Sequence, residues 1–134
     1  MLRGALILLT LSLLAACGAP DAPGDVGVCW RVTHGPNGKV AFSEVARNVD
    51  DLDTCAVLLE GYRLQGQADA NGAYQGFFIF VDGRAISSAQ SLHGFRYPIF
   101  QPPQRAAIDR DLRALIAQRG GQLPNAAEID LERH

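Results

Sequence analysis

The fold is decided by the stretch AYQGFFIFVDG, residues 73–83, which contains the most strand-like run in the chain. Apolar side chains occupy both faces of residues 73–81, a pattern typical of one central strand that is covered on two sides. The Asp82-Gly83 pair that follows is a signal for a two-residue type I′ hairpin turn. We therefore expect residues 84–91 to return as a partner strand, with Val81 facing Arg84.

A first hairpin is predicted upstream of this one. Residues 26–33 alternate, with Val26, Val28, Trp30 and Val32 on one face, as in a half-buried strand. The run HGPNG at 34–38 is dense in turn residues, and Asn-Gly is a strong hairpin signal between two strands. Residues 39–44 alternate again and form the second arm.

Two helices are predicted from apolar residues at three- and four-residue spacing. The first begins at Asn48 or Asp50, which can cap a helix, and ends near Gly66. The second covers residues 104–119, where Asp109 and Arg113 have the spacing of an i,i+4 ion pair. The apolar stripes are Leu52, Cys55, Leu58, Leu59 and Tyr62 in the first helix, and Ile108, Leu112, Leu115 and Ile116 in the second.

These elements predict an α+β fold with a mainly antiparallel sheet of about four strands, made of two hairpins and packed with two helices. We expect residues 26–121 to form this single domain. Residues 92–103 carry three prolines and are expected to be a crossing loop, and residues 122–134 a weakly ordered tail.

The N-terminus has the pattern of an export signal. Arg3 precedes an uncharged apolar run, residues 4–16, that is too short to span a bilayer comfortably. The run ends in Leu14-Ala15-Ala16-Cys17, which resembles the lipobox of bacterial lipoproteins. The resemblance implies that residues 1–16 are a cleaved signal peptide and that Cys17 becomes the first residue, carrying acyl chains such as palmitate.

The resemblance also implies an address in the cell. Residues 17–25 hold the lipidated cysteine and a short segment rich in Pro, Gly and Asp, expected to be a flexible tether. Two or more acyl chains hold a protein stably at a membrane. Gly18 follows the cysteine where an aspartate would favour the inner membrane, so we expect the outer membrane, facing the periplasm.

The other two cysteines are an even pair in an oxidising compartment. Cys29 lies on the first predicted strand and Cys55 on the first predicted helix, so we expect one disulfide between them. Two buried free thiols are the alternative. A reactive cysteine fits less well, because the chain has no CxxC pair.

Charge and histidine spacing argue against several classes of function. The net charge is −2 and Lys39 is the only lysine, so there is no basic footprint for nucleic acid. The three histidines, His34, His93 and His134, lack the short spacing of zinc ligands. The aspartates at 50, 51 and 53 do not continue into a calcium loop. The sequence therefore predicts no metal and no cofactor.

The run HGFRYPIF at 93–100 is the candidate binding site, because so much apolar surface on a loop either covers the core or meets a partner. The residues are His93, Phe95, Arg96 and Tyr97. His93 is the only candidate general base, with Ser87, Ser88 and Ser91 nearby, but no nucleophile motif accompanies it.

The predicted function is a membrane-anchored envelope lipoprotein, a non-enzymatic binding or accessory domain for a protein or cell-wall partner. A periplasmic inhibitor or immunity protein is the first alternative, with loop 93–100 as the plug. A small hydrolase that uses His93 is the second.

Overall fold

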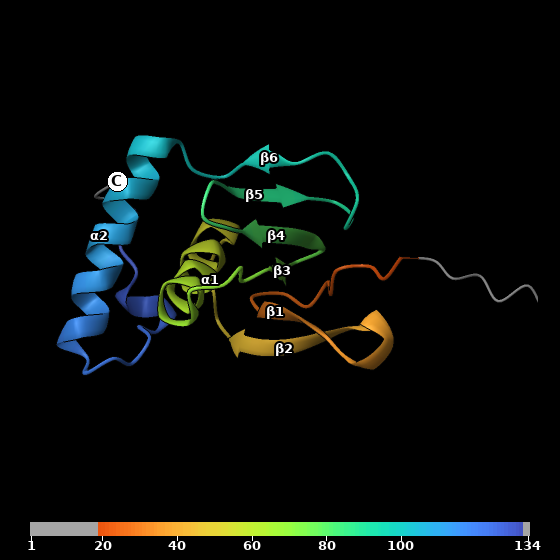
Figure 1. The fold of residues 1–134 in the computed structure, drawn as a ribbon, viewed down its shortest axis with the longest axis horizontal. Coiled ribbons are helices and arrows are strands. Elements are labelled where there is room, and N and C mark those ends of the chain that lie inside the picture. The colour runs from red at the N-terminus through yellow and green to blue at the C-terminus, as the bar shows by residue number, and fades with distance from the viewer. Residues whose placement is uncertain (1–18, 133–134) are drawn as a thin grey trace, which may run out of the picture.

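Residues 19–132 are described by a computed structural model, in which six antiparallel strands form one sheet and two helices cover one of its faces (Figure 1). The strand order is β2-β1-β3-β4-β5-β6. The strands are β1 (Cys29–His34), β2 (Val40–Ala46), β3 (Gly72–Tyr74), β4 (Phe77–Val81), β5 (Ile86–Ala89) and β6 (Tyr97–Pro98). The helices are α1 (Leu52–Gly66) and α2 (Pro102–Gln118), and the 3₁₀ turns are η1 (Pro36–Gly38) and η2 (Ala126–Glu128). The predicted α+β class is confirmed.

The prediction of about four strands undercounts the sheet. Residues 73–81 are not one strand, because Gln75 and Gly76 have φ angles of 44° and 88° and reverse the chain between β3 and β4. Two consecutive residues with positive φ are the signature of a type I′ turn. The other additional strand is β6, which pairs with β5 inside the segment predicted as a loop.

The turn between β4 and β5 is longer than the two residues predicted. Val81 pairs with Ile86 rather than with Arg84. The carboxylate of Asp82 accepts hydrogen bonds from the backbone N–H groups of Arg84 and Ala85, at 2.7 and 2.9 Å. This aspartate side chain therefore organises a four-residue loop in place of a type I′ turn.

The helices begin and end close to the predicted positions. The N-cap of α1 is Asp51, which accepts a hydrogen bond from Thr54 N at 2.7 Å, and its C-cap is Gln67 in the left-handed region. α2 begins two residues earlier than predicted, at Pro102, because proline is well suited to the first helical positions.

The larger core lies between the sheet and the helices, and the disulfide crosses it. Cys29 of β1 and Cys55 of α1 are joined with a Cα–Cα distance of 5.4 Å, so the predicted bridge is confirmed. Packing continues beyond Gly121, since Ile129 and Leu131 lie against this core. Within residues 19–132, neither helix is long and apolar enough to cross a membrane.

Candidate functional site

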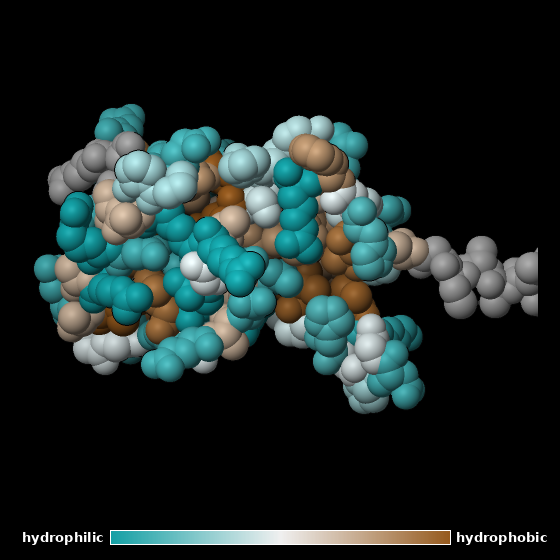
Figure 2. Space-filling model, turned by 45° about the horizontal axis from the view of Figure 1, so that its top comes forward, coloured by the Kyte–Doolittle hydropathy of each residue, from teal (hydrophilic) through white to brown (hydrophobic). Residues whose placement is uncertain are grey.

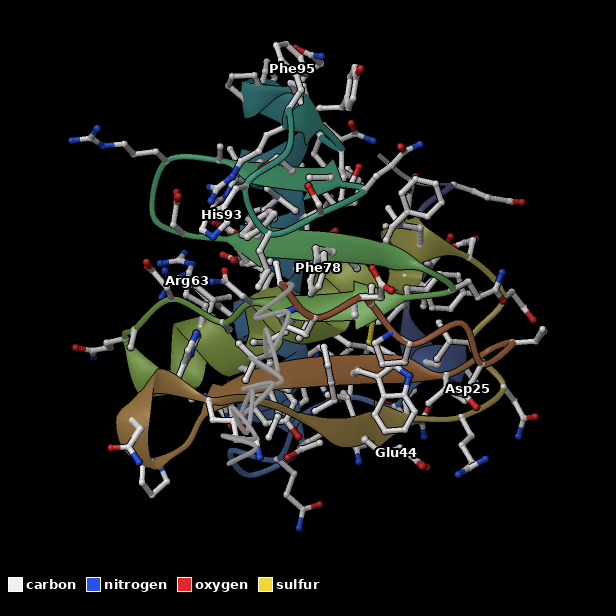
Figure 3. The ribbon with its side chains drawn as sticks, turned by 90° about the vertical axis from the view of Figure 1, so that its right-hand side faces the viewer. Asp25, Glu44, Arg63, Phe78, His93 and Phe95 are labelled. Carbon is white, nitrogen blue, oxygen red and sulfur yellow. A yellow bond between two sulfur atoms is a disulfide. The ribbon has the colours of Figure 1, made fainter. Side chains whose placement is uncertain are left out.

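The face of the sheet opposite the helices carries a second apolar cluster, and Figure 3 looks onto this face. We call it the open face. Its buried members are Val32, Ala73, Phe78, Phe80 and Ala89, and its partly exposed members are Trp30, Val40 and Phe42. Both faces of the central strands are therefore apolar, as predicted, but only one is covered by helices.

The N-terminal segment lies against the open face. Ala22 packs on the cluster, and the carbonyl of Pro23 accepts a hydrogen bond from Gly76 N at 2.8 Å. Gly27 N donates to Gln75 Oε1 at 2.8 Å, and Val49 N donates to the Gly27 carbonyl at 2.9 Å. Three hydrogen bonds thus attach residues 23–27 to the domain, and the described chain begins on this side of the sheet (Figure 1).

The loop between β5 and β6 folds back over the same face. Leu92 packs on the open-face cluster, and the Arg96 guanidinium lies 3.7 Å from the centroid of the Phe80 ring. A cation at this distance is attracted by the negative face of the ring. The loop turns at Gly94, where a Cβ atom would lie 2.7 Å from Ser91 Oγ, so a larger residue here would require the exposed Ser91 side chain to move.

Two aromatic side chains of this loop project away from the domain. Phe95 and Tyr97 are 76% and 61% exposed, and their ring centroids lie 5.0 Å apart. We call them the aromatic pair. They stand at the β6 edge of the sheet, where Figure 3 places Phe95 beyond the last strand. Because Pro98 of β6 has no N–H to donate, this edge is poorly suited to pairing with a further strand.

The four predicted binding residues therefore divide into two pairs. Arg96 is stacked on Phe80, whereas Phe95 and Tyr97 are mostly exposed. Figure 3 shows His93 on the side of the open face and Phe95 beyond the last strand. His93 is exposed and makes no hydrogen bond or ion pair with another residue of the described chain. Cys17, the predicted lipidation site, lies outside the described residues.

Two of the three serines near His93 in the sequence lie on opposite faces of β5. Ser87 is buried on the open face opposite Phe80, and Ser88 is on the helix side, because neighbouring residues of a strand point to opposite faces. Within residues 19–132, no group of three or more His, Cys, Asp or Glu side chains is arranged to hold a metal ion. In the described part of the chain, none of Ser87, Ser88 and Ser91 forms a hydrogen bond with His93.

Sequence reasoning missed a buried ionic cluster between the helices. Glu60 of α1 is fully buried and accepts hydrogen bonds from Arg63, at 2.8 and 2.6 Å, and from Arg105 of α2, at 3.3 Å. Asp109 lies 3.7 Å from Arg105 Nε and 4.0 Å from Arg63 Nη2, so it pairs with these arginines and not with Arg113 as predicted. The sequence held a signal for this cluster, because Glu60 and Arg63 have the i,i+3 spacing, and Arg105 and Asp109 the i,i+4 spacing, of ion pairs on a helix.

The electrostatics of this cluster favour a structural role. Burial, and then the neighbouring Glu60 carboxylate, raise the pKa of Asp109 to about 6. Arg105 also donates to the Asp82 carbonyl, which joins α2 to the loop between β4 and β5. Two grooves in the described surface lie elsewhere: one of about 290 Å³ between α2 and residues 128–131, and one of about 570 Å³ between residues 48–54 and 126–132. The cluster joins elements of the fold, and none of its four charged residues lines either groove.

No protein-family model matches this chain, and neither a characterised protein nor a solved structure matches it.

Proposed function

We propose that this protein is a lipid-anchored accessory protein of the bacterial envelope, held by Cys17, that binds a protein or cell-wall partner through the aromatic pair. The resemblance of Leu14-Ala15-Ala16-Cys17 to a lipobox supports the anchor. The outer membrane, facing the periplasm, is the proposed location, because Gly18 follows the cysteine.

The single observation that carries the proposal is the disulfide between Cys29 and Cys55. Disulfides persist in oxidising compartments such as the periplasm and are rare in the bacterial cytosol, so the bridge supports export. The bridge also uses both other cysteines of the chain, which leaves Cys17 as the one thiol available for lipid.

The aromatic pair is the proposed binding surface because of its exposure and shape. Aromatic residues are enriched at the centres of protein interfaces, where they bury a large area on few rotatable bonds. Phe95 and Tyr97 are among the few large apolar side chains that are mostly exposed in the described chain. Arg96 between them is stacked on Phe80, which ties the middle of this loop to the domain.

An inhibitor or immunity protein of the periplasm is the second candidate, because a protruding loop with two exposed aromatic rings also suits an enzyme's cleft. The two candidates differ in the consequence of binding. An inhibitor abolishes turnover by the protein it captures, whereas an accessory domain leaves that turnover unchanged. Catalysis by His93 is disfavoured because no carboxylate of the described chain orients its ring.

The anchor is tested by metabolic labelling with a palmitate analogue. Cys17→Ser should abolish labelling and release the protein from the membrane fraction. The matched control is the double variant Cys29→Ser/Cys55→Ser, which keeps Cys17 and should remain labelled. Labelling that persists in Cys17→Ser would remove the basis for the anchor.

The binding surface is tested by crosslinking in intact cells, followed by identification of the captured protein. We expect Phe95→Ala/Tyr97→Ala to lose the crosslinked partner, since truncating central aromatic residues costs about 2 kcal/mol or more at many interfaces. Phe77→Ala is the matched control, because Phe77 is a partly exposed aromatic residue at the start of β4, away from the pair. Equal capture by both variants would contradict the proposal.

A further inference from the structure

Only a short segment of chain separates the open face from Cys17, the proposed site of the lipid. Ala22 packs on this face and is five residues beyond Cys17, so an extended chain separates their Cα atoms by at most about 18 Å. Pro23 is bonded to Gly76 in the turn between β3 and β4, two central strands of the sheet. The anchor therefore leaves the domain near the middle of the open face.

This reach is too short for the helices to turn toward the membrane. Half the width of a six-stranded sheet is about 12 Å, which the chain would have to cross to reach an edge. It would then have to pass the sheet and a helix of about 10 Å diameter. That path exceeds about 18 Å, so a lipid on Cys17 keeps the helix side away from the bilayer, and the open face is the apolar surface nearest the anchor.

The chemistry of the open face fits a membrane surface. Trp30, Val40 and Phe42 are only partly covered there, and Val26 in the N-terminal segment is 85% exposed. Figure 2 shows apolar surface on the side of the molecule from which the N-terminal trace leaves. Tryptophan is enriched at membrane interfaces, where its ring lies at the level of the headgroups. Acidic residues such as Asp21 and Glu44 are also exposed nearby, so apolar contact rather than charge is the expected attraction.

We infer that the open face is a membrane-docking surface, and that its occupant is the phospholipid of the bilayer in which the acyl chains of Cys17 insert. This inference rests on the proposed anchor. It assigns the two surfaces to different tasks: the open face lies on lipid, and the aromatic pair, at the β6 edge, stays accessible to a partner (Figure 3).

The test uses Trp30, the only tryptophan of the chain, as a reporter of membrane depth. The lipidated protein is purified from membranes and reconstituted into phosphatidylethanolamine–phosphatidylglycerol vesicles whose acyl chains carry bromine near the headgroup. We expect brominated lipid to quench Trp30. The control variant Trp30→Phe/Ala117→Trp moves the reporter to an exposed position on α2 with the same anchor, and its quenching should be at least about twofold weaker.

The outcomes separate this inference from the proposed function. Protein that carries lipid on Cys17 by mass spectrometry and floats with the vesicles, but shows equal quenching at both positions or none at Trp30, overturns the docking surface alone. Protein without lipid that fails to float overturns the anchor and, with it, this inference. Quenching confined to Trp30 in floated, lipidated protein supports both.

Discussion

Replacing Glu60 should destabilise the domain strongly, because its carboxylate is fully buried between two arginines. In Glu60→Leu, the charges of Arg63 and Arg105 lose this partner. Breaking one side of a buried ion pair costs about 3–5 kcal/mol. Arg63 is 18% exposed and can turn toward water, while Arg105 keeps Asp109 and the Asp82 carbonyl. We therefore expect the lower end, about 3 kcal/mol of unfolding free energy.

The measurement is urea unfolding at pH 7, followed by the fluorescence of Trp30. A loss of about 3 kcal/mol is smaller than the 5–15 kcal/mol typical of a domain, so the variant should still fold. With a slope of about 1.3 kcal/mol per molar urea, the midpoint should fall by about 2 M. Glu44→Leu is the matched control: Glu44 pairs with Arg47 at 2.7 Å on the surface, where such pairs contribute about 0–1 kcal/mol.

A second variant distinguishes lost ion pairing from lost packing. Glu60→Leu/Arg105→Met replaces both buried charges by apolar groups, which is often neutral or stabilising relative to the intact pair. We expect it to recover much of the stability lost in Glu60→Leu. The reasoning is refuted if Glu60→Leu lowers the midpoint no more than Glu44→Leu does.

Three further predictions follow from the fold. The pKa of Asp109 is raised to about 6 from its ordinary 3.8. Between about pH 4 and 6, the folded protein therefore keeps a proton on this carboxyl group that the unfolded chain has lost. Asp109 thus makes the unfolding free energy fall as the pH rises from about 4 to 6. We expect the unfolding free energy to fall by about 1–2 kcal/mol over this pH range, allowing for partial exposure of the side chain. Asp109→Asn should flatten the dependence of the urea midpoint on pH, and an unchanged dependence would contradict this prediction. Gly72→Ala should lower the unfolding free energy, measured with urea, by about 1–3 kcal/mol, because its Cβ would overlap the carbonyl oxygen of Trp30 and the Leu59 side chain. An unfolding free energy within about 0.5 kcal/mol of the parent's would be inconsistent with this close approach. Reducing the disulfide should lower the unfolding free energy by about 3–4 kcal/mol, given its sequence separation of 26, and equal oxidised and reduced midpoints would argue against that constraint.

The elements with strong local signals could be predicted from the sequence. The β1–β2 hairpin follows from period-two alternation around an Asn-Gly turn, and α1 follows from its apolar stripe behind an aspartate cap. The disulfide followed from counting cysteines once Cys17 was assigned to lipid. These features depend on neighbouring residues or on composition, which a single sequence contains.

The missed features depend on context that the sequence does not display. Gln75-Gly76 forms a turn only because β3 and β4 pair on either side of it, and the continuous apolar run hid the break. β6 has two residues, one of them proline, and exists because β5 offers an edge. Glu60 lies in a helix where a charged residue is expected at the surface, and its burial is compensated by Arg63 on the same helix together with Arg105, which only the packing of α2 brings near. In the loop between β5 and β6, only the folded structure shows that Arg96 stacks on Phe80 while Phe95 and Tyr97 are exposed to solvent.

The bridge between Cys29 and Cys55 also affects how the protein responds to proteolysis. The loop that it closes contains the β1–β2 hairpin, whose η1 turn is exposed. Exposed loop tips are the preferred sites of proteolytic cleavage. A cut at this turn would divide the backbone, but the N-terminal piece would stay covalently joined to the rest through sulfur. A nicked molecule would therefore separate into two fragments only after reduction.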